Sequence, residues 1–186
     1  MTEPKQALLV IDVQNDFCPG GTLAVPHGDE VIRPLNKLID DFLERGAPVY
    51  KSRDWHPPTT KHFVAYGGTW PVHCVQNTEG AEFHPALRDD PRITVISKGL
   101  DDKDGYSAFD DTDLASRLNQ QHVEELVIGG LATDYCVKNT VVDALKHGFK
   151  VKAIENAMRA VELQPGDGDR AIAEMRDAGA EIVEAR

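Results

Sequence analysis

One cysteine in this 186-residue chain follows an apolar strand and opens a helix, a position where thiols do chemistry. Residues 129–136 read GGLATDYC and come directly after the apolar run 125–128. Thr133 is a helix-capping residue type, and apolar side chains recur at helical spacing over 134–146. We therefore predict Cys136 in the first turn of a helix, where the dipole lowers the pKa of a thiol and backbone N–H groups can hold an oxyanion. A buried, inert thiol is the alternative reading of Cys136 alone.

Polar side chains also stand at the ends of three other apolar runs. Asp12 lies at the end of the first run, and Lys98 directly follows the third. Asp54 and His56 come after the second. Ligands bind beyond the carboxyl ends of the strands in an open parallel sheet, so these side chains and Cys136 are predicted to meet at one edge. Capping or surface roles explain each residue taken alone, but their coincidence at one edge favours a site.

The spacing of Asp54 and His56 lets both side chains approach one metal ion from an extended segment. His62 and His73, in the long irregular stretch 53–90, are two further nitrogen donors. A mixed carboxylate and imidazole set favours Zn²⁺ over Ca²⁺, with Fe²⁺ and Mn²⁺ as alternatives. The sequence thus predicts one divalent metal ion at this edge of the sheet.

Apolar runs and amphipathic stretches alternate along the chain, which predicts an α/β fold. The expected strands are 7–13, 49–52, 92–97, 125–128, 150–154 and 181–183. The expected helices are 29–45, 111–120, 134–147 and 167–178. We predict a three-layer sandwich whose mostly parallel central sheet of about six strands carries helices on both faces, in one domain over residues 1–186. The stretches 53–90 and 99–109 lack periodicity, and loops of that length are usually functional or disordered.

Charge and composition exclude several classes of partner. The net charge of −11 argues against nucleic acid and anionic membranes, which attract basic surfaces. No apolar run is long enough to span a membrane, and the first ten residues lack a signal-peptide pattern. The odd number of cysteines, at 18, 74 and 136, predicts a reducing, cytoplasmic location. A small-molecule substrate is the expected partner, and association into a homo-oligomer is left open.

Six short motifs together resemble the nicotinamidase branch of the isochorismatase-like cysteine hydrolases. They are DVQNDF (12–17), SRDWHP (52–57), WPVHC (70–74), SKG (97–99), YSAF (106–109) and GLATDYCV (130–137). The motifs occur in the family's order and span the chain from near residue 7 to about residue 160. Each motif alone is weak, whereas the ordered set is very specific.

The resemblance implies a three-layer α/β fold, a catalytic triad and one metal ion beside it. It assigns the catalytic roles to Asp12, Lys98 and Cys136. It assigns the metal to Asp54, His56 and His73, with His62 matching a fourth ligand that only part of the family has. It also implies a non-proline cis peptide bond between Leu131 and Ala132.

The family implies hydrolysis of nicotinamide to nicotinate and ammonia, a step of NAD salvage, and activity on pyrazinamide as well. In that mechanism Asp12 takes the proton of Cys136, and the thiolate attacks the carboxamide to form a thioester. The N–H groups of Ala132 and Cys136 hold the oxyanion, and the metal binds the pyridine nitrogen. The residues expected to contact the substrate are Phe17, Trp70, Tyr106, Leu131 and Ala132.

Other classes fit the sequence less well. Isochorismate hydrolases of this fold lack the cysteine and carbamoyl amidases lack the metal ligands, so Cys136 together with Asp54 and His56 favours the nicotinamidase branch. An amidase of the N-carbamoyl or ureidoacrylate type is the alternative. A metal-binding or redox module would leave Asp12 and Lys98 without a role. A dinucleotide-binding oxidoreductase would need a GxGxxG turn where DVQN stands.

Overall fold

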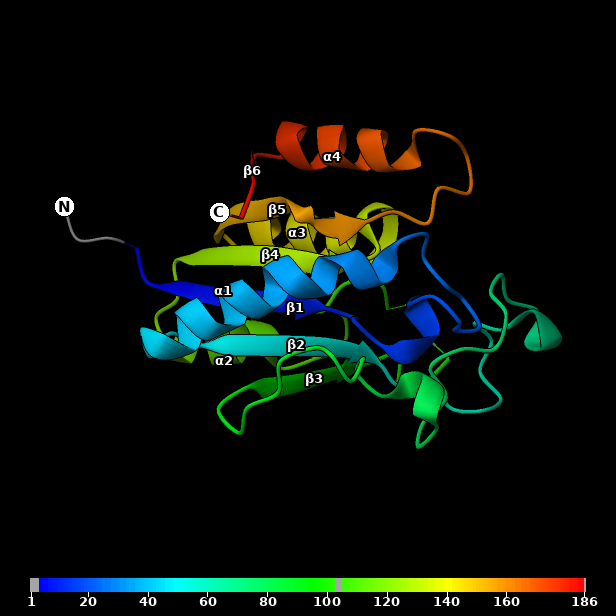
Figure 1. Ribbon diagram of the computed structural model, residues 1–186. Coiled ribbons are helices and arrows are strands. Elements are labelled where there is room, and N and C mark those ends of the chain that lie inside the picture. The colour runs from blue at the N-terminus through cyan, green and yellow to red at the C-terminus, as the bar shows by residue number, and fades with distance from the viewer. Residues whose placement is uncertain (1–3, 103–104, 186) are drawn as a thin grey trace.

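Six strands form one sheet in the computed structural model, which describes residues 4–102 and 105–185. Every strand pairs in parallel with its neighbours, in the order β3-β2-β1-β4-β5-β6 (Figure 1). The strands are β1 Gln6–Ile11, β2 Val49–Asp54, β3 Thr94–Lys98, β4 Glu125–Leu131, β5 Lys150–Arg159 and β6 Glu181–Val183.

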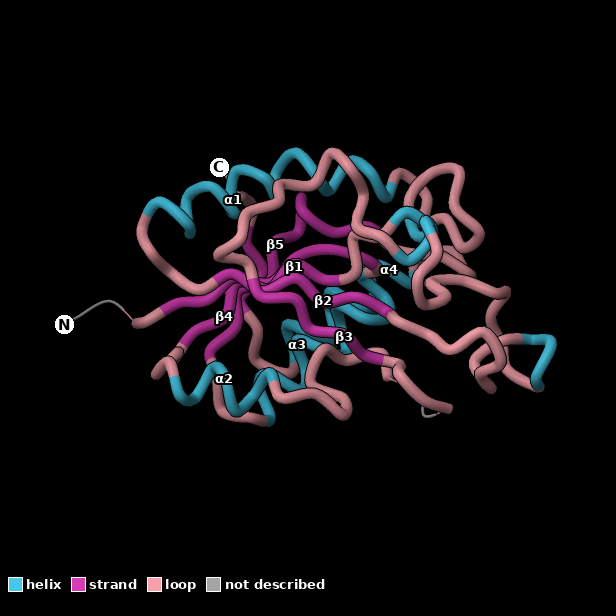
Figure 2. The backbone as a smooth tube through the Cα atoms, turned by 90° about the horizontal axis from the view of Figure 1, so that it is seen from below, coloured by secondary structure: helices cyan, strands magenta, loops and turns pink. Residues whose placement is uncertain are grey.

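Helices cover both faces of this sheet. They are α1 Ile32–Glu44, α2 Leu114–Gln120, α3 Lys138–Lys146 and α4 Asp167–Asp177. Helix α1 lies on one face and α2 and α3 on the other (Figures 1 and 2). Apolar residues of α1 at helical spacing, such as Leu35 and Ile39, join the core on its face, whereas Leu118, Val141 and Met175 join the opposite core. The predicted three-layer α/β sandwich is confirmed. None of the helices in the described ranges has the length and apolar character needed to cross a membrane.

The strand order reverses between β1 and β4, which is where open parallel sheets bind ligands. Asp12 directly follows β1, and Leu131 is the last residue of β4. Asp54 and Lys98 are the last residues of β2 and β3 and lie opposite each other in the parallel register. The predicted site residues therefore do meet at one edge.

Three strands are longer than the sequence pattern predicts: β2 ends at Asp54 rather than at residue 52, and β4 and β5 extend further still. Strand β4 continues through Gly129 and Gly130 to Leu131, and β5 continues past Ile154 to Arg159. Glycines and polar side chains conceal these extensions, because a ladder of backbone hydrogen bonds needs no apolar side chain. Gly130 has φ +130°, and a Cβ there would lie 2.1 Å from the carbonyl oxygen of Ile11. The close pairing of β1 with β4 thus requires a glycine at this position.

The helix after β4 begins differently from the prediction. Residues Thr133–Val137 form a single π-helical turn, and α3 starts only at Lys138. The N-cap residue is Ala132, and no side chain caps the turn, so the predicted Thr133 cap is wrong. Cys136 lies in this wide turn rather than in a regular first α-turn. The peptide bond between Leu131 and Ala132 is cis, as the family resemblance implied.

The two irregular stretches enclose the carboxyl edge of the sheet. The first contains two short 3₁₀ turns, η3 Val64–Tyr66 and η4 Glu79–Ala81, and η3 projects furthest from the sheet (Figure 1). Residues 103–104 of the second stretch lie outside the described ranges. Helix α2 begins at Leu114 rather than at the predicted 111, because Asp111 has a left-handed φ of +50°.

Candidate active site

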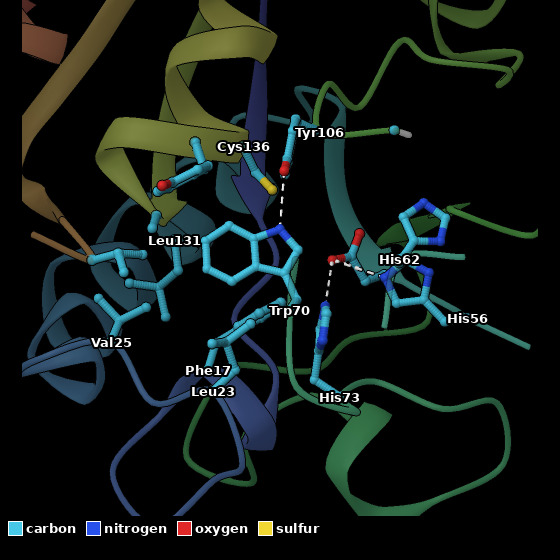
Figure 3. A pocket seen from close by; sticks show the side chains of 15 residues that line it. Phe17, Leu23, Val25, His56, His62, Trp70, His73, Tyr106, Leu131 and Cys136 are labelled. Carbon is cyan, nitrogen blue, oxygen red and sulfur yellow. Dashed lines mark hydrogen bonds and ion pairs between the residues drawn. The ribbon is translucent and has the colours of Figure 1, made fainter. Parts of the chain in front are cut away.

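A pocket opens at the carboxyl edge of the sheet, with a polar side and an apolar side (Figure 3). Figure 3 shows His56, His62 and His73 on one side of Trp70, and Phe17, Val25 and Leu131 on the other. The lining residues are Phe17, Leu23, Val25, Asp54, His56, His62, Trp70, His73, Gly105, Tyr106, Leu131, Ala132, Tyr135, Cys136 and Val161. All predicted substrate-contacting and metal-ligating residues line this pocket, with Cys136 between the two sides.

Lys98 connects the acidic residues to the cysteine. Its Nζ atom lies 2.8 Å from Asp12 Oδ2 and 3.5 Å from Cys136 Sγ, and it also pairs with Asp54 Oδ1. Asp12 and Lys98 are buried behind the pocket wall, whereas Cys136 forms part of that wall. The predicted Asp12, Lys98 and Cys136 set is thus assembled around a single buried ammonium group.

Burial decides the protonation state of the thiol. It raises the pKa of Cys136 well above its usual value, even though the charge of Lys98 opposes the shift. The expected lowering of the thiol pKa by the helix dipole is therefore wrong. Cys136 holds its proton at rest, and a base is needed to remove it.

Asp12 has the properties of such a base. Burial raises the pKa of its carboxyl group, with Lys98 opposing the shift. Oδ1 accepts a hydrogen bond of 2.6 Å from Ser52 Oγ. Oδ2 forms the ion pair with Lys98 but accepts no well-aligned hydrogen bond from the described residues. An acceptor oxygen of Asp12 lies within 4.8 Å of Cys136 Sγ, close enough for proton transfer after a small movement.

Asp54, His56 and His73 form a compact donor group on the polar side. Their ligand atoms all lie within 4.8 Å of one another, and all three residues are buried. Asp54 Oδ2 lies 3.5 Å from His56 Nε2 and 3.9 Å from His73 Nε2. Burial alone would raise the pKa of the Asp54 carboxyl, but Lys98 and His56 outweigh it and lower that pKa. Asp54 is therefore ionised, as a metal ligand must be.

Backbone carbonyls orient both histidine rings. His56 Nδ1 lies 3.0 Å from the carbonyl oxygen of Gly99, and His73 Nδ1 lies 2.7 Å from that of Pro71. A carbonyl only accepts, so Nδ1 carries a proton in each ring, and in the neutral form of the ring Nε2 presents its lone pair toward Asp54. Burial also lowers the pKa of His73, which favours its neutral form. The carboxylate and two imidazole lone pairs fit a borderline divalent ion such as Zn²⁺.

Comparison with known proteins identifies the family. Residues 6–186 match the Isochorismatase domain. The chain belongs to this family. The nicotinamidase of Escherichia coli K12 is 44% identical over 201 residues, which cover 96% of this chain and 94% of that protein. The pyrazinamidase of Pyrococcus horikoshii in complex with zinc superposes with a TM-score of 0.93 at 46% identity, over 97% of this chain and 99% of the other. PnC1 from L. infantum in complex with nicotinate gives 0.89 at 35% identity, over 97% and 93% of the two chains.

Within this isochorismatase-family pocket, His62 stands beside the donor group rather than in it. Its ring centroid lies 4.5 Å from that of His56, and its Nδ1 pairs with the hydroxyl of Thr60. The group whose ligand atoms are mutually close contains Asp54, His56 and His73 but not His62. Its role as a fourth ligand stays a prediction.

The aromatic wall of the family pocket joins the two irregular stretches. Trp70 Nε1 donates a 3.0 Å hydrogen bond to the hydroxyl of Tyr106. The Tyr135 ring packs against both, with centroids 5.0 Å from Trp70 and 5.6 Å from Tyr106. Phe17 lies across the pocket, 5.6 Å from the ring of His73.

Some lining residues were not predicted from the sequence. Leu23, Val25, Tyr135 and Val161 all line the pocket. Tyr135 stands next to Cys136 in a quoted motif, so that motif could have indicated it. Val161 had no such signal, because a tertiary contact brings it there: the Asp134 carboxylate accepts its backbone N–H at 2.9 Å.

Proposed function

We propose that this isochorismatase-family protein is a nicotinamidase that hydrolyses nicotinamide to nicotinate and ammonia, in NAD salvage. The observation that carries the proposal is that Cys136 lies 3.5 Å from Lys98, whose ammonium group also pairs with Asp12 and with Asp54 of the donor group. The nicotinamidase and pyrazinamidase relatives, at 44% and 46% identity, support the same activity.

Asp12 moves the proton in both halves of the reaction. It takes the thiol proton of Cys136, whose sulfur forms a bond to the carboxamide carbon. Asp12 then gives that proton to the amide nitrogen, so that the C–N bond breaks and ammonia leaves. Asp12 then takes a proton from water, whose oxygen forms a bond to the thioester carbon. The C–S bond breaks, Asp12 returns the proton to the sulfur of Cys136, and the product leaves and ionises to nicotinate in solution.

Two backbone groups and one side chain stabilise the charges that develop. We assign the oxyanion to the N–H groups of Ala132 and Cys136, in the turn that follows β4. The charge of Lys98 favours the ionised forms of Asp12 and Asp54, and their two charges in turn hold the pKa of its ammonium well above the usual value against the effect of burial. It remains cationic and does not act as a proton donor.

Asp54, His56 and His73 would hold one divalent metal ion, for which we propose Zn²⁺, with His62 as a fourth ligand or as a partner of one. When bound, the metal supplies a Lewis-acid site that fixes the pyridine nitrogen of the substrate. The aromatic ring would lie between apolar and aromatic side chains, namely Phe17, Trp70, Tyr106, Leu131 and Ala132. Pyrazinamide has nearly the same shape and also offers a ring nitrogen, so we expect it to be hydrolysed.

We also propose a single domain over residues 1–186 and a cytoplasmic location. One sheet with a core on each face supports the first. All three cysteines are free and buried, which supports the second.

Ammonia release from nicotinamide by the purified protein tests the proposed activity. Parallel assays with pyrazinamide and with an N-carbamoyl amino acid compare the alternative substrates. We expect the two heteroaromatic carboxamides, nicotinamide and pyrazinamide, to be hydrolysed and the carbamoyl compound to be left intact. Turnover of the carbamoyl compound alone would replace the proposal with an amidase of another branch of the family.

A further inference from the structure

Gln14 is fully buried. Both ends of the Gln14 side-chain amide contact the backbone of Asp54, a proposed metal ligand. Its Oε1 accepts the N–H of Asp54 at 2.8 Å, and its Nε2 donates to the carbonyl oxygen of Asp54 at 2.8 Å. Nε2 also donates to the carbonyl of Ala81 at 2.9 Å. The amide therefore makes three hydrogen bonds, all to backbone.

These bonds extend the sheet beyond the end of a strand. Strand β1 pairs with β2 up to Val10 and Lys51, and Asp12 then turns away with φ +49°. On its other side, Asp54 still lies opposite Lys98 of β3. The Gln14 amide supplies the donor and the acceptor that a continuing β1 would have given to Asp54.

The Asp54 backbone can move very little without breaking a contact, because the two carboxylate oxygens of this residue have different partners. Oδ1 pairs with Lys98 Nζ, while Oδ2 faces the Nε2 atoms of His56 and His73. A small rotation of the Asp54 backbone would separate one oxygen from its partners. Holding the Asp54 backbone on both sides, by Gln14 and by β3, preserves the contact of Oδ1 with Lys98 and that of Oδ2 with the two histidines.

We propose that Gln14 is a positioning residue for the metal-binding group. Its amide fixes the Asp54 backbone so that one carboxylate reaches Lys98 and the metal position together. The inference rests on the metal site of the proposed function and adds a residue that contacts neither metal nor substrate.

The test measures Zn²⁺ affinity of metal-free protein by competition with a chromophoric chelator. Gln14→Met keeps the size of the side chain and removes all three hydrogen bonds. We expect its Zn²⁺ affinity to fall on the order of 10- to 100-fold, as for other residues that hold ligands in place. The matched control is Asn156→Leu, because Asn156 binds the N–H and carbonyl of Ala185 in the same two-ended way, at 2.9 and 3.0 Å. The control is expected to bind Zn²⁺ like the wild type.

A second variant covers the case in which Gln14→Met does not fold. Gln14→Glu keeps the acceptor for the Asp54 N–H and loses the Nε2 donors. The added negative charge of a glutamate would by itself strengthen Zn²⁺ binding. A fall in the Zn²⁺ affinity of this variant would therefore come from the lost positioning of Asp54.

The outcomes separate this inference from the proposed function. A fall in Zn²⁺ affinity for the Gln14 variants alone supports it. Unchanged affinity, or an equal fall in Asn156→Leu, overturns it while the metal site of the wild type stands. A wild-type protein that binds no Zn²⁺ overturns both the metal site and the role of Gln14. Ammonia release by the wild type reports on the proposed activity separately.

Discussion

Asp12 presents its two carboxylate oxygens to different partners, and this division suits a group that must both hold and transfer a proton. Oδ1 is anchored by Ser52, while Oδ2 faces Lys98. Burial raises the pKa of Asp12 and also that of Cys136, so both groups bind a proton more tightly than they would in water. The raised pKa of Asp12 makes it a stronger base than an exposed aspartate, which favours its taking the proton of Cys136.

Replacing the nucleophile tests the assignment of Cys136 among the three buried cysteines. Cys136→Ala should abolish turnover and leave fold and metal content intact, because a buried thiol packs as a small apolar group. Mass spectrometry of the wild type, quenched during turnover, should find the nicotinoyl thioester on Cys136. A thioester on Cys18 or Cys74 would contradict the assignment.

Replacing the base separates its chemistry from its packing. Asp12→Asn keeps the shape of the side chain and removes its ability to take a proton, so kcat should fall on the order of 10²- to 10⁴-fold. Ser52→Ala is the matched control, since it removes the 2.6 Å hydrogen bond but leaves the carboxylate facing Lys98. Its kcat should fall far less. Near-normal turnover of Asp12→Asn would show that Asp12 is only structural.

At the scale of elements, the order of strands and helices could be predicted from the sequence, because apolar runs mark buried parallel strands. The proposed site residues at strand ends could be placed at one edge for the same reason, whereas His62 and His73 lie in the irregular stretch 53–90, where no such pattern places them. Their local geometry could not. The extension of β4 through Gly130 depends on backbone pairing with β1, and no local side-chain pattern indicated the π turn around Cys136. Gln14 and Val161 act through contacts between segments distant in the chain, which no local pattern records.

The sheet depends on the close approach of Gly130 in β4 to Ile11 in β1. Gly130→Ala should lower the free energy of unfolding, because its Cβ would overlap the backbone of Ile11 in β1. Gly148→Ala is the control: Gly148 also has a positive φ, of +88°, but a Cβ added there would meet no atom of another segment within 4 Å. The control should lose only the conformational term of about 1–2 kcal/mol. Urea denaturation measures both variants, and equal losses would show that the close β1–β4 approach does not limit stability.

At the scale of the whole molecule, charge and topology both favour a cation at the proposed metal site. The chain carries a net charge of −11, which favours the approach of divalent ions over anions. Strands β2 and β3 end in Asp54 and Lys98, so the parallel register of the sheet places a proposed metal ligand next to the proposed catalytic ammonium group. Removing the metal should therefore affect substrate binding as well as turnover.

Metal removal and refilling test this arrangement as a whole. Protein stripped with a chelator should lose activity and bind nicotinamide more weakly, and Zn²⁺, Fe²⁺ or Mn²⁺ should restore it where Ca²⁺ and Mg²⁺ do not. His56→Ala and His73→Ala should each lose most bound metal, because both are in the compact donor group, while His62→Ala should retain a substantial share. Metal content by mass spectrometry, together with nicotinamide binding by calorimetry, checks each variant. Full activity in metal-free protein would contradict the metal site and leave a metal-independent amidase of the same fold.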